Sequence, residues 1–445
     1  MLILSIDFGT SAVKMSLLEC SAEAHSGKVL DWAIEEYRYI LLPDEKVELS
    51  PEALLSAMEK ASRKLNAELL KKAEILCYDT FSPSPVFMDE AGALVYPNII
   101  THMDRRSRRQ TEVIEERIGR DNYLSIAGIY PFAGGCSAMT LIWFAENMNE
   151  ILKRSYRFGH LPLYIHKLFT GEWAFDFVNA SMTGLYETTT QKGWSADLLK
   201  AFEISPSLFG EIYSPGTPKG KLLKGIATRL GLTAGITVCV GTNDMAAAIM
   251  GANNTKSGDI LISSGSSEMV SILSDKALTN PAYYLRNSAL PGLWQIYATT
   301  AGGFAVDWFY RELGKDLERK EFFRYIDECL DNAALLRKGG LSFAPYLTGD
   351  RQSLEKKTAS WTGLTLGATR EQMLLAVFDG IQSVMQGTIE MADKIITTNK
   401  EIKLTGGMVT EAYIRYKLGA MPSCRITRVD DCPILGNAAL AMRYL

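Results

Sequence analysis

Short apolar runs alternate with amphipathic segments along this chain. Runs such as 1–6, 74–78 and 236–240 have the length and apolar character of strands buried in a sheet. Segments such as 51–69 and 137–151 instead repeat apolar residues every three or four positions, and Ser50 followed by Pro51 is typical of a helix start. This alternation of strands and helices predicts an α/β fold.

The length of 445 residues exceeds what one hydrophobic core usually serves, and we expect two domains. No low-complexity stretch or charge block marks a flexible linker, so we expect the boundary at a compact hinge. The sequence Gly251-Ala252-Asn253-Asn254 is the best candidate. We therefore predict an N-terminal domain over residues 1–252 and a C-terminal domain over residues 253–445.

The first strand-like run ends in residues suited to binding phosphate and a metal ion. Asp7 is followed by Gly9, by the hydroxyls of Thr10 and Ser11, and by Lys14 in the next strand-like run. Gly9 would accept the positive φ of a tight turn. Backbone N–H groups and hydroxyls could then face phosphate oxygens while Asp7 holds Mg²⁺ through water. In the alternative interpretation, the segment is a hairpin whose polar residues only satisfy the turn.

The same arrangement recurs near the start of the predicted second domain. The apolar run at 260–262 leads into Ser263-Ser264-Gly265-Ser266-Ser267, and another apolar run follows at 269–273. Overlaying Gly265 on Gly9 places Ser266 on Thr10. Two domains that each begin with a strand-turn-strand phosphate loop could hold one nucleotide between them. Coincidence between two short hairpins is the alternative.

A candidate catalytic carboxylate follows the run at 236–240. The sequence Gly241-Thr242-Asn243-Asp244 leads into the small-residue run 245–248, so Asp244 is expected to start a helix. The helix dipole favours the ionised carboxylate at that place, and it could accept a proton from a substrate hydroxyl. A helix N-cap without a catalytic role is the alternative.

Two glycine pairs, Gly302-Gly303 and Gly406-Gly407, each stand between a predicted strand and a predicted helix. Backbone without side chains permits the close approach of a flat base or a phosphate. Glycines before helices also serve as packing devices, and this alternative stays open for both pairs.

Composition narrows the classes of function. Lysine and arginine number 47 against 51 acidic residues, and the net charge of −4 does not provide the positive field of a nucleic-acid-binding protein. The seven cysteines form no C-x-x-C pair, and no apolar stretch has the length of a membrane span. We expect a cytoplasmic protein with reduced thiols, without a nucleic-acid or membrane partner.

Along essentially its whole length, the chain resembles the FGGY carbohydrate kinases of the actin and hexokinase-like superfamily. The order and spacing of short motifs carry this resemblance. The motifs are Asp7 to Lys14, Leu168-Phe169-Thr170-Gly171 with Asp176, Asn179-Ala180-Ser181 and Trp194, Gly241 to Asp244, Gly265-Ser266-Ser267, Gly302-Gly303 with Trp308, Pro345-Tyr346-Leu347-Thr348-Gly349-Asp350-Arg351, Gly406-Gly407, and Leu435-Gly436-Asn437-Ala438, where the family usually closes with G-A-A.

The resemblance implies two RNase H-like, actin-like ATPase domains with a central cleft, with ATP in the cleft and a hydroxylated substrate held mainly by the first domain. It assigns the general base to Asp244, and Mg²⁺ to Asp7 and Asp244. Catalysis would then rest on positioning and charge neutralisation. The residues that it assigns to phosphate and nucleotide binding are Thr10, Ser11, Lys14, Gly265, Ser266, Gly302, Gly303, Gly406 and Gly407.

The departures from the family concern the substrate site. Glycerol kinases carry an arginine-glutamate pair, and xylulokinases a methionine-histidine pair, where this chain has Ser82-Pro83. His102 stands where the family has tryptophan in W-x-D-x-R, while Asp104 and Arg106 keep the other places. The candidate substrate contacts are Ser82, His102, Asp104 and Asp244. A structural hydrogen bond of His102 and a pair between Asp104 and Arg106 remain alternatives.

Two hypotheses of function follow. The first is ATP-dependent phosphorylation of a hydroxyl on a small sugar, ketose, polyol or sugar acid, and the retained Asp7, Lys14 and Asp244 favour it. The second is a nucleotide-binding relative that acts as a sensor or regulatory module, and the missing substrate clamps favour it. The acceptor and the oligomeric state stay open, with a homodimer as one possibility.

Overall fold

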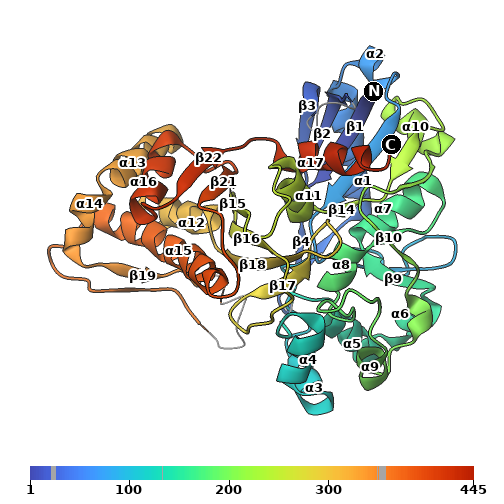
Figure 1. Cartoon of the computed structure of the whole chain (residues 1–445), viewed down its shortest axis with the longest axis horizontal. Coiled ribbons are helices and arrows are strands. Elements are labelled where there is room, and N and C mark those ends of the chain that lie inside the picture. Colours follow the sequence, from blue (N-terminus) through green and yellow to red (C-terminus); the bar gives the residue numbers. More distant parts are fainter. Residues whose placement is uncertain (22–26, 133, 348, 350–356) are drawn as a thin grey trace. The chain divides into compact units, whose positions relative to one another are not determined.

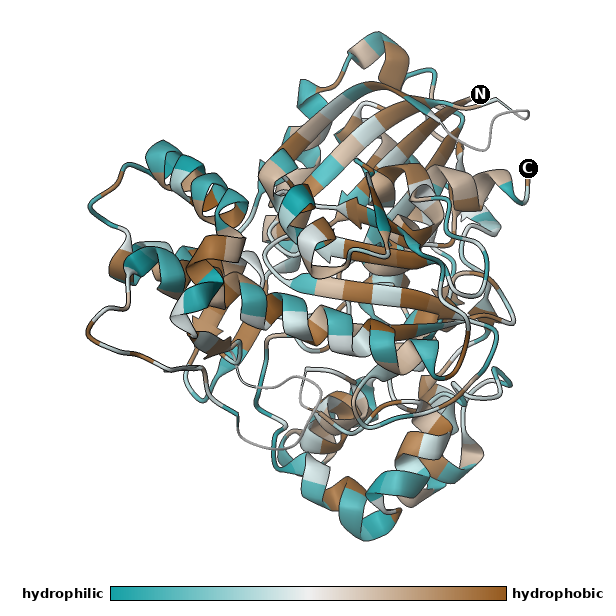
Figure 2. Ribbon diagram, turned by 60° about the vertical axis from the view of Figure 1, so that its left-hand side comes forward, coloured by the Kyte–Doolittle hydropathy of each residue, from teal (hydrophilic) through white to brown (hydrophobic). Residues whose placement is uncertain are grey.

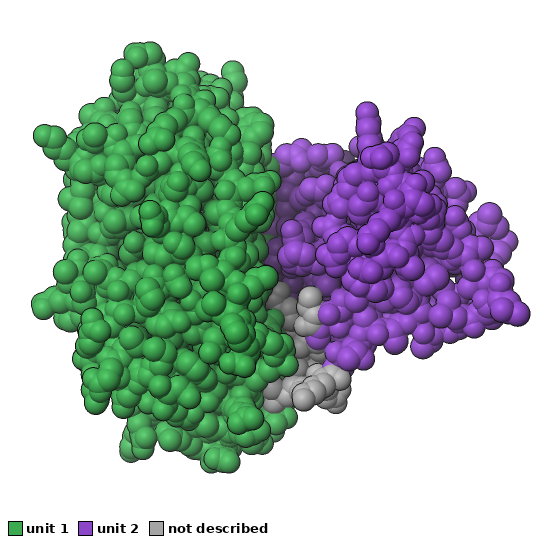
Figure 3. Space-filling view, turned by 180° about the vertical axis from the view of Figure 1, so that it is seen from behind, with its two compact units in different colours: residues 1–253, 285–293, 431–445 green, residues 254–284, 294–430 purple. Residues whose placement is uncertain are grey.

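The structure is a computed structural model, and it describes residues 1–21, 27–132, 134–347, 349 and 357–445. The chain forms an α/β protein, as predicted, and divides into two compact units. Unit 1 comprises Met1–Asn253, Leu285–Leu293 and Asp431–Leu445, and unit 2 comprises Asn254–Tyr284 and Trp294–Asp430 (Figure 3). Unit 1 therefore includes two segments from the second half of the chain.

Unit 1 is built on a seven-stranded sheet with the order β12-β13-β6-β1-β2-β3, in which β14 also pairs with β6. β1 and β2 are antiparallel neighbours, as the strand-turn-strand prediction requires, whereas β6 runs parallel to β1, β13 and β14. The strands are β1 (Leu2–Phe8), β2 (Ala12–Glu19), β3 (Lys28–Glu36), β6 (Ile75–Thr80), β12 (Pro218–Lys221), β13 (Thr237–Cys239) and β14 (Thr242–Asn243).

The side chains of β1 alternate between the two faces of this sheet. Its even-numbered apolar residues join the larger core together with α1 (Pro51–Lys64), whereas Ile3 packs in a second cluster with the last helix, α17 (Cys432–Met442). Ser5 and Asp7 share the face of Ile3, and the Ser5 hydroxyl donates to the carbonyl oxygen of Ile434 at 3.0 Å. Figure 2 shows brown, apolar residues along many strands, interrupted by white and teal ones.

The helix α11 (Asp244–Gly251) crosses α17 at two glycines. A Cβ at Gly436 would lie 1.7 Å from the carbonyl oxygen of Ala247, and one at Gly251 would lie 1.9 Å from that of Cys432. The two backbones are therefore in direct contact, and Figure 1 shows the red α17 beside α11. Gly436 of the closing motif is therefore needed for packing, because a side chain at this position would prevent α17 from approaching α11, the helix that begins at Asp244.

The smaller elements of unit 1 surround this frame. They form the sheets β4-β5-β8, β7-β9 and β10-β11, and a set of mostly short helices. The strands are β4 (Ile40–Leu42), β5 (Lys46–Leu49), β7 (Pro85–Met88), β8 (Ile99–Ile100), β9 (Arg157–His160), β10 (Phe175–Asp176) and β11 (Ile212–Tyr213). The helices are α2 (Ala67–Leu70), α3 (Gln110–Arg117), α4 (Arg120–Ala127), α5 (Ala138–Asn147), α6 (Asn149–Arg154), α7 (Leu161–Thr170), α8 (Phe177–Met182), α9 (Ala196–Ala201) and α10 (Lys224–Leu230).

Unit 2 repeats the strand-turn-strand device in a second sheet, in which five strands run in the order β18-β16-β15-β21-β22. They are β15 (Ile260–Ser264), β16 (Glu268–Ser274), β18 (Trp294–Thr300), β21 (Glu401–Thr405) and β22 (Arg425–Arg428). The helices are α12 (Gly303–Leu313), α13 (Arg319–Asp331), α14 (Ala333–Leu336), α15 (Arg370–Asp393) and α16 (Glu411–Ala420), and β19 (Ser342–Ala344) pairs with β20 (Ser360–Thr362). β17 (Tyr284–Asn287) lies where the chain passes from unit 2 to unit 1.

A buried ion pair fixes the start of β16. Lys417 of α16 lies 2.8 Å from Glu268, and both side chains are at most 1% exposed. The hydroxyl of Tyr413 also donates to Glu268 at 3.0 Å, and the ammonium of Lys417 donates to Gln382 at 2.8 Å. Removing one partner would leave an uncompensated buried charge, so this pair holds the end of the second loop in place.

Two predicted helices are shorter than their apolar periodicity suggests. The segment 51–69 ends as α1 at Lys64 and restarts as α2 after Asn66, whose side chain caps the new helix. The segment 137–151 likewise divides at Met148 into α5 and α6. Apolar periodicity therefore does not show where the hydrogen bonding of a helix stops.

All seven cysteines are free thiols, and six of them are buried. Within the described ranges, no helix is both long and apolar enough to cross a membrane.

The glycine crossing gives a test of the frame of unit 1. We expect Gly436→Ala to lower the free energy of unfolding by about 3 kcal/mol or more, or to prevent folding, since a methyl group there overlaps backbone atoms. Gly225→Ala is the control, because no atom lies within 4 Å of its added Cβ in α10, and it should be neutral or stabilise by up to about 1 kcal/mol. Thermal unfolding followed by circular dichroism measures both. Equal melting temperatures of Gly436→Ala and the parent would contradict the close approach.

Candidate active site

Two tyrosines fix the turn between β1 and β2. The hydroxyl of Tyr37 donates to the carbonyl oxygen of Gly9, and that of Tyr39 donates to the carbonyl oxygen of Thr10. The N–H of Tyr37 donates to the carbonyl oxygen of Ser11 at 3.1 Å. The carbonyl groups of the turn are thus engaged, while the N–H groups of Thr10 and Ser11 are bonded to no other described residue. An anion-binding turn requires this arrangement.

Gly9 does not adopt the positive φ expected from the sequence. The turn is closed by the N–H of Gly9, which donates to the carbonyl oxygen of Ala12 at 3.0 Å. A Cβ at Gly9 would lie 3.4 Å from that oxygen and 3.4 Å from Oδ1 of Asp7, which is ordinary contact. The expectation of a positive φ at Gly9 is therefore wrong, because the turn closes without the left-handed conformation that favours glycine.

The pairing of β1, β6 and β14 brings three carboxylates to neighbouring strand ends. Asp7 lies opposite Asp79 across β1 and β6, and Asp79 lies opposite Thr242 across β6 and β14. Asp244 follows directly after β14. Burial is the largest cause that raises the pKa of each of the three carboxyl groups, and repulsion from Asp7 adds to it at Asp79 and Asp244.

Asp244 is the first residue of α11, and Asn243 is its N-cap. The side-chain oxygen of Asn243 accepts from the N–H of Met245 at 3.1 Å and of Ala246 at 3.3 Å, and its amide donates to Oδ1 of Asp244 at 2.7 Å. The alternative in which Asp244 is the N-cap is therefore wrong. Burial and the charge of Asp7 raise the pKa of Asp244 to about 7, and the charge of Arg286 opposes this shift. A carboxylate with a pKa near neutrality suits a general base.

Sequence reasoning missed Asp79 and its partner Asn437. Asp79 is fully buried, and the amide of Asn437 donates to its Oδ2 at 2.5 Å. The same amide also lies 3.2 Å from the hydroxyl of Ser5, which is on the same face of β1. Two signals were present in the sequence. Asp79 directly follows the apolar run 75–78, and Asn437 stands where the family usually has alanine in its closing motif.

The cluster fits a hard cation such as Mg²⁺. Oδ1 of Asp7 and Oδ1 of Asp79 are buried and accept a hydrogen bond from no described residue. Unpartnered oxygen atoms in an all-oxygen setting are the donors that Mg²⁺ prefers. No three described His, Cys, Asp or Glu side chains converge as a complete ligand set. An ion held by Asp7 would therefore keep water or phosphate oxygens among its ligands, as Mg²⁺ usually does.

Ser82 and His102 lie in the surroundings of Asp244. Ser82 follows two residues after β6, the strand whose Thr80 lies opposite Asn243. The ring of Tyr39 contacts Phe81 edge-on at 6.4 Å, and Phe81 contacts the ring of His102 at 6.0 Å. Burial raises the pKa of Tyr39, and the negative charge of Asp244 adds to this shift, which places the tyrosine near the carboxylate.

Asp104 is engaged in a buried ion pair. Its carboxylate accepts from the N–H of Val47 at 2.8 Å and from Nε of Arg106 at 2.9 Å, and the guanidinium also pairs with Glu48. The alternative that Asp104 and Arg106 pair with each other is thus realised. The contacts favour a structural role, and substrate binding by Asp104 stays a prediction.

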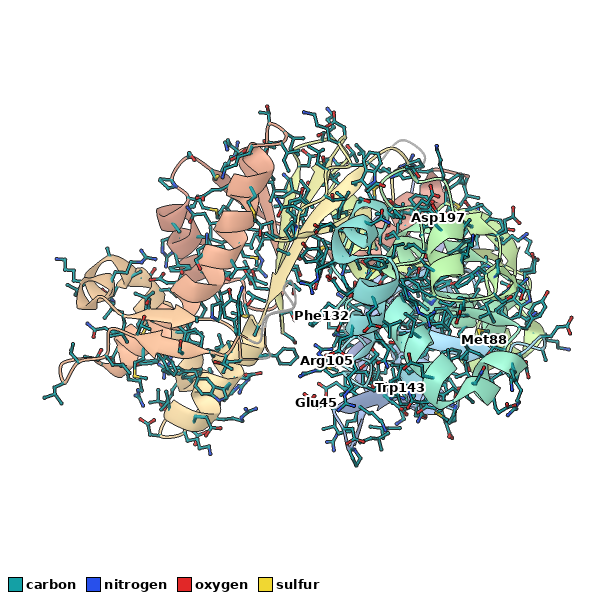
Figure 4. All side chains as sticks on the ribbon, turned by 90° about the horizontal axis from the view of Figure 1, so that it is seen from below. Glu45, Met88, Arg105, Phe132, Trp143 and Asp197 are labelled. Carbon is teal, nitrogen blue, oxygen red and sulfur yellow. The ribbon has the colours of Figure 1, made fainter. Side chains whose placement is uncertain are left out.

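The backbone of His102 is held by Arg105. Nη1 of Arg105 donates to the carbonyl oxygen of His102 at 2.8 Å, and its guanidinium stacks on Phe132 at 5.1 Å (Figure 4). This contact fixes where His102 stands without deciding what its ring binds.

Lys14 forms an ion pair with Asp431 and lies 5.5 Å from the ring centre of Trp32. It also lies opposite Asp7 in the register of β1 and β2, and its charge lowers the pKa of Asp7 against the effect of burial. A phosphate contact of Lys14 stays a prediction. To make this contact, Lys14 would have to leave its ion pair with Asp431.

The predicted nucleotide residues of unit 2 gather around the end of β15. The N–H of Gly303 donates to the carbonyl oxygen of Gly265 at 2.8 Å, and that of Phe304 donates to the carbonyl oxygen of Ser266 at 2.9 Å. The N–H of Met408, just after Gly406-Gly407, donates to the carbonyl oxygen of Ser264 at 3.0 Å. One corner thus joins the second loop, the start of α12 and the end of β21.

The glycines of this corner serve two purposes. A Cβ at Gly302 would lie 2.6 Å from the N of Glu268, one at Gly303 would lie 2.8 Å from the carbonyl oxygen of Gly265, and one at Gly406 would lie 2.3 Å from that of Ser264. These three glycines allow backbone packing, which was the alternative. Added Cβ atoms at Gly265 and Gly407 would meet nothing closer than 4.0 Å, so these two leave space that a ligand could use. In the motif at 345–351, Thr348, Asp350 and Arg351 lie outside the described residues.

Two models of known protein-family domains match the chain. The model of the N-terminal domain of the FGGY family of carbohydrate kinases matches residues 2–251, and the model of the C-terminal domain matches residues 260–445. The chain therefore belongs to the FGGY family of carbohydrate kinases.

Relatives and solved structures extend along most of the chain. A xylulose kinase of Lactococcus lactis is 27% identical over 90% of this chain and 78% of its own, and an L-fuculokinase of Escherichia coli is 25% identical over 80% and 74%. A crystal structure of xylulose kinase from Rhodospirillum rubrum superposes with a TM-score of 0.87 at 19% identity, covering 99% of this chain and 89% of that one. These likenesses confirm the actin-like ATPase fold.

A buried histidine behind Ser82 gives a pH test of this region. Burial lowers the pKa of His160 from 6.5 to about 4, so the unfolded chain takes up a proton before the folded one as the pH falls. The folded state should therefore lose about 1.4 kcal/mol per pH unit from this group between pH 6.5 and pH 4. We expect His160→Gln to remove this contribution to the slope in urea unfolding. Ser137→Ala, which removes a partner of His160 without titrating, should lower stability but keep the slope.

Proposed function

We propose that this protein transfers the terminal phosphoryl group of Mg·ATP to a hydroxyl of a small sugar, ketose, polyol or sugar acid, with Asp244 as the general base. One observation carries the proposal. Asp7 and Asp244, far apart in the sequence, belong to one buried cluster of carboxylates at neighbouring strand ends, and burial raises the pKa of Asp244 to about 7. Asn243 is the N-cap of the helix, so Asp244 is not needed in that role.

Asp244 and Asp7 have separate tasks. Asp244 accepts the proton of the attacking hydroxyl, and the N–H groups of Met245 and Asn243's side chain orient its carboxylate. Asp7 holds Mg²⁺, and the turn of Thr10 and Ser11 offers N–H groups to phosphate oxygens. When bound, Mg·ATP supplies the transferable phosphoryl group and the positive charge that offsets its developing negative charge. Gly265 and Gly407 of unit 2 are the places where we propose close nucleotide approach.

The names of relatives support a sugar as the acceptor, since they include xylulose kinase, L-fuculokinase and gluconokinase. The contacts of this chain favour Ser82 and His102 over Asp104 as substrate residues, because Asp104 already accepts hydrogen bonds from Val47 and Arg106. We propose that the domain boundary lies between residues 252 and 253. The N-terminal domain holds the substrate, the metal and the base, and the C-terminal domain holds the adenosine site.

The general base can be tested directly. We expect Asp244→Asn to lower kcat by at least about 100-fold, because the substitution removes the proton acceptor, while nucleotide affinity changes little. A coupled assay of ADP release with D-xylulose, L-fuculose, D-gluconate and glycerol measures turnover. Asp197→Asn is the matched control: Asp197, labelled in Figure 4, also lies in the first turn of a short helix of unit 1 but is exposed.

Turnover by Asp244→Asn at the parent rate would remove the assigned role. A parent protein that binds ATP but releases no ADP with any sugar would instead favour the sensor hypothesis.

The metal site has its own test. We expect Asp7→Asn to raise the concentration of Mg²⁺ needed for half-maximal activity by about tenfold or more, because it removes a negatively charged ligand. Binding of Mn²⁺ alone, followed by its paramagnetic resonance signal, should weaken in parallel. Asp197→Asn should change neither value. An unaltered requirement for Mg²⁺ together with unaltered Mn²⁺ binding would exclude Asp7 from the metal site.

A further inference from the structure

A chain of buried hydrogen bonds ends at the hydroxyl of Ser82. That hydroxyl donates to Oδ1 of Asn179 in α8 at 2.6 Å. Nδ1 of His160 lies 3.2 Å from the same oxygen, and Nε2 of His160 lies 2.6 Å from the hydroxyl of Ser137. On the other side, Nδ2 of Asn179 donates to Oδ2 of Asp176 at 2.8 Å. Asn179, His160 and Asp176 are fully buried, whereas Ser82 is partly exposed.

The directions of these hydrogen bonds are fixed by Asp176. Its Oδ1 accepts from the N–H groups of Val178 and Asn179 and from the hydroxyl of Thr242, so this carboxylate acts only as an acceptor. The amide of Asn179 must therefore turn its NH₂ group toward Asp176 and its oxygen toward Ser82. Since that oxygen can only accept, both His160 Nδ1 and the Ser82 hydroxyl donate to it, and Ser137 donates to Nε2.

The proton of Ser82 is thus committed inward, and only lone pairs of its oxygen remain for a ligand. No described residue donates to this oxygen. The position matters because Thr80 lies opposite Asn243, and the chain continues from these two residues to Ser82 and to Asp244. Ser82 and Asp244 thus extend from paired strand ends, so a substrate whose hydroxyl reaches Asp244 could present a neighbouring group to Ser82.

We propose that Asn179 is a positioning residue that makes Ser82 a hydrogen-bond acceptor only, so that the enzyme selects substrates with a donating hydroxyl next to the hydroxyl that is phosphorylated. The inference rests on the proposed kinase function and specifies its substrate class. A carbonyl, an ether or a hydrogen at that neighbouring position offers Ser82 no donor. The site then rejects such compounds because a polar atom of the protein is left unpaired.

The test compares Ser82→Ala, Asn179→Ala and the double variant in the ADP-release assay. The probes are D-xylulose, L-fuculose, D-gluconate and glycerol, each phosphorylated probe being paired with its analogue that lacks the neighbouring hydroxyl. We expect Ser82→Ala to raise KM for the phosphorylated probe by about three- to tenfold, the value of one neutral hydrogen bond, with kcat changed by less than about twofold. The parent should show the same penalty for the deoxy analogue, and Ser82→Ala should not distinguish the two compounds.

Asn179→Ala tests positioning separately from contact. Without the amide, the Ser82 hydroxyl is free to turn its proton outward, so KM for the probe should rise and the preference over the deoxy analogue should shrink. The double variant should be no worse than the more affected single variant, because both act through one hydrogen bond. Ser125→Ala, at an exposed serine of unit 1, is the control and should match the parent. Circular dichroism melting identifies a variant that fails to fold, and Ser82→Ala then carries the test alone.

The outcomes separate this inference from the proposed function. Phosphorylation of a probe with KM and the deoxy preference unchanged in Ser82→Ala would overturn the inference and leave the kinase function intact. Additive effects of Ser82→Ala and Asn179→Ala would overturn the positioning role. A protein that phosphorylates none of the probes would overturn both the proposed function and this inference.

Discussion

The site depends on one costly constraint, the burial of three carboxylates at the ends of β1, β6 and β14. Asp7 lies opposite Asp79, and Asp79 lies opposite Thr242. Because these neighbouring strands are parallel, the three residues lie at the same end of the sheet. Burial removes water from these carboxylates and raises the pKa of each one, and repulsion from Asp7 adds to this effect at Asp79 and Asp244. A fold that keeps them together must supply compensating groups.

The compensation comes from the last segment of the chain. α17 returns to unit 1, and its Asn437 donates to Asp79 while Asp431, just before the helix, pairs with Lys14. This approach needs the contact between Gly436 and Ala247 of α11, the helix that begins at Asp244. The packing of α11 on α17 and the electrostatics of the cluster therefore depend on each other. A larger residue at the crossing would move Asn437 away from Asp79, the carboxylate that it stabilises.

The sequence predicted the parts of this arrangement that depend on local pattern. Both strand-turn-strand units, the helix start at Asp244 and the capped start of α1 follow from residue order within a few positions, and the structure has them. It did not predict that Asn243 caps α11, because two adjacent polar residues compete for one position. Asp79 and Asn437 were missed because each is recognisable only after distant strands and helices are paired. The roles of Tyr37 and Tyr39 likewise depend on a turn twenty-five or more residues away in the chain, a pairing that no local pattern encodes.

The replacement of the family's charged or basic substrate clamp by Ser82 fits the chemistry of Asp244. A fixed cation beside this carboxylate would lower its pKa and weaken it as a base, and a second acid would raise the pKa further and keep it protonated at neutral pH. A neutral hydroxyl avoids both effects while still offering a polar contact. The hydrogen bonds of Asn179, His160 and Asp176 then fix the direction of that contact without adding charge at the exposed end, because the one acidic member of the chain is buried and fully bonded. Selectivity by hydrogen-bond polarity is therefore compatible with the base that we propose, because it leaves the pKa of Asp244 at about 7, whereas selectivity by charge would shift that pKa.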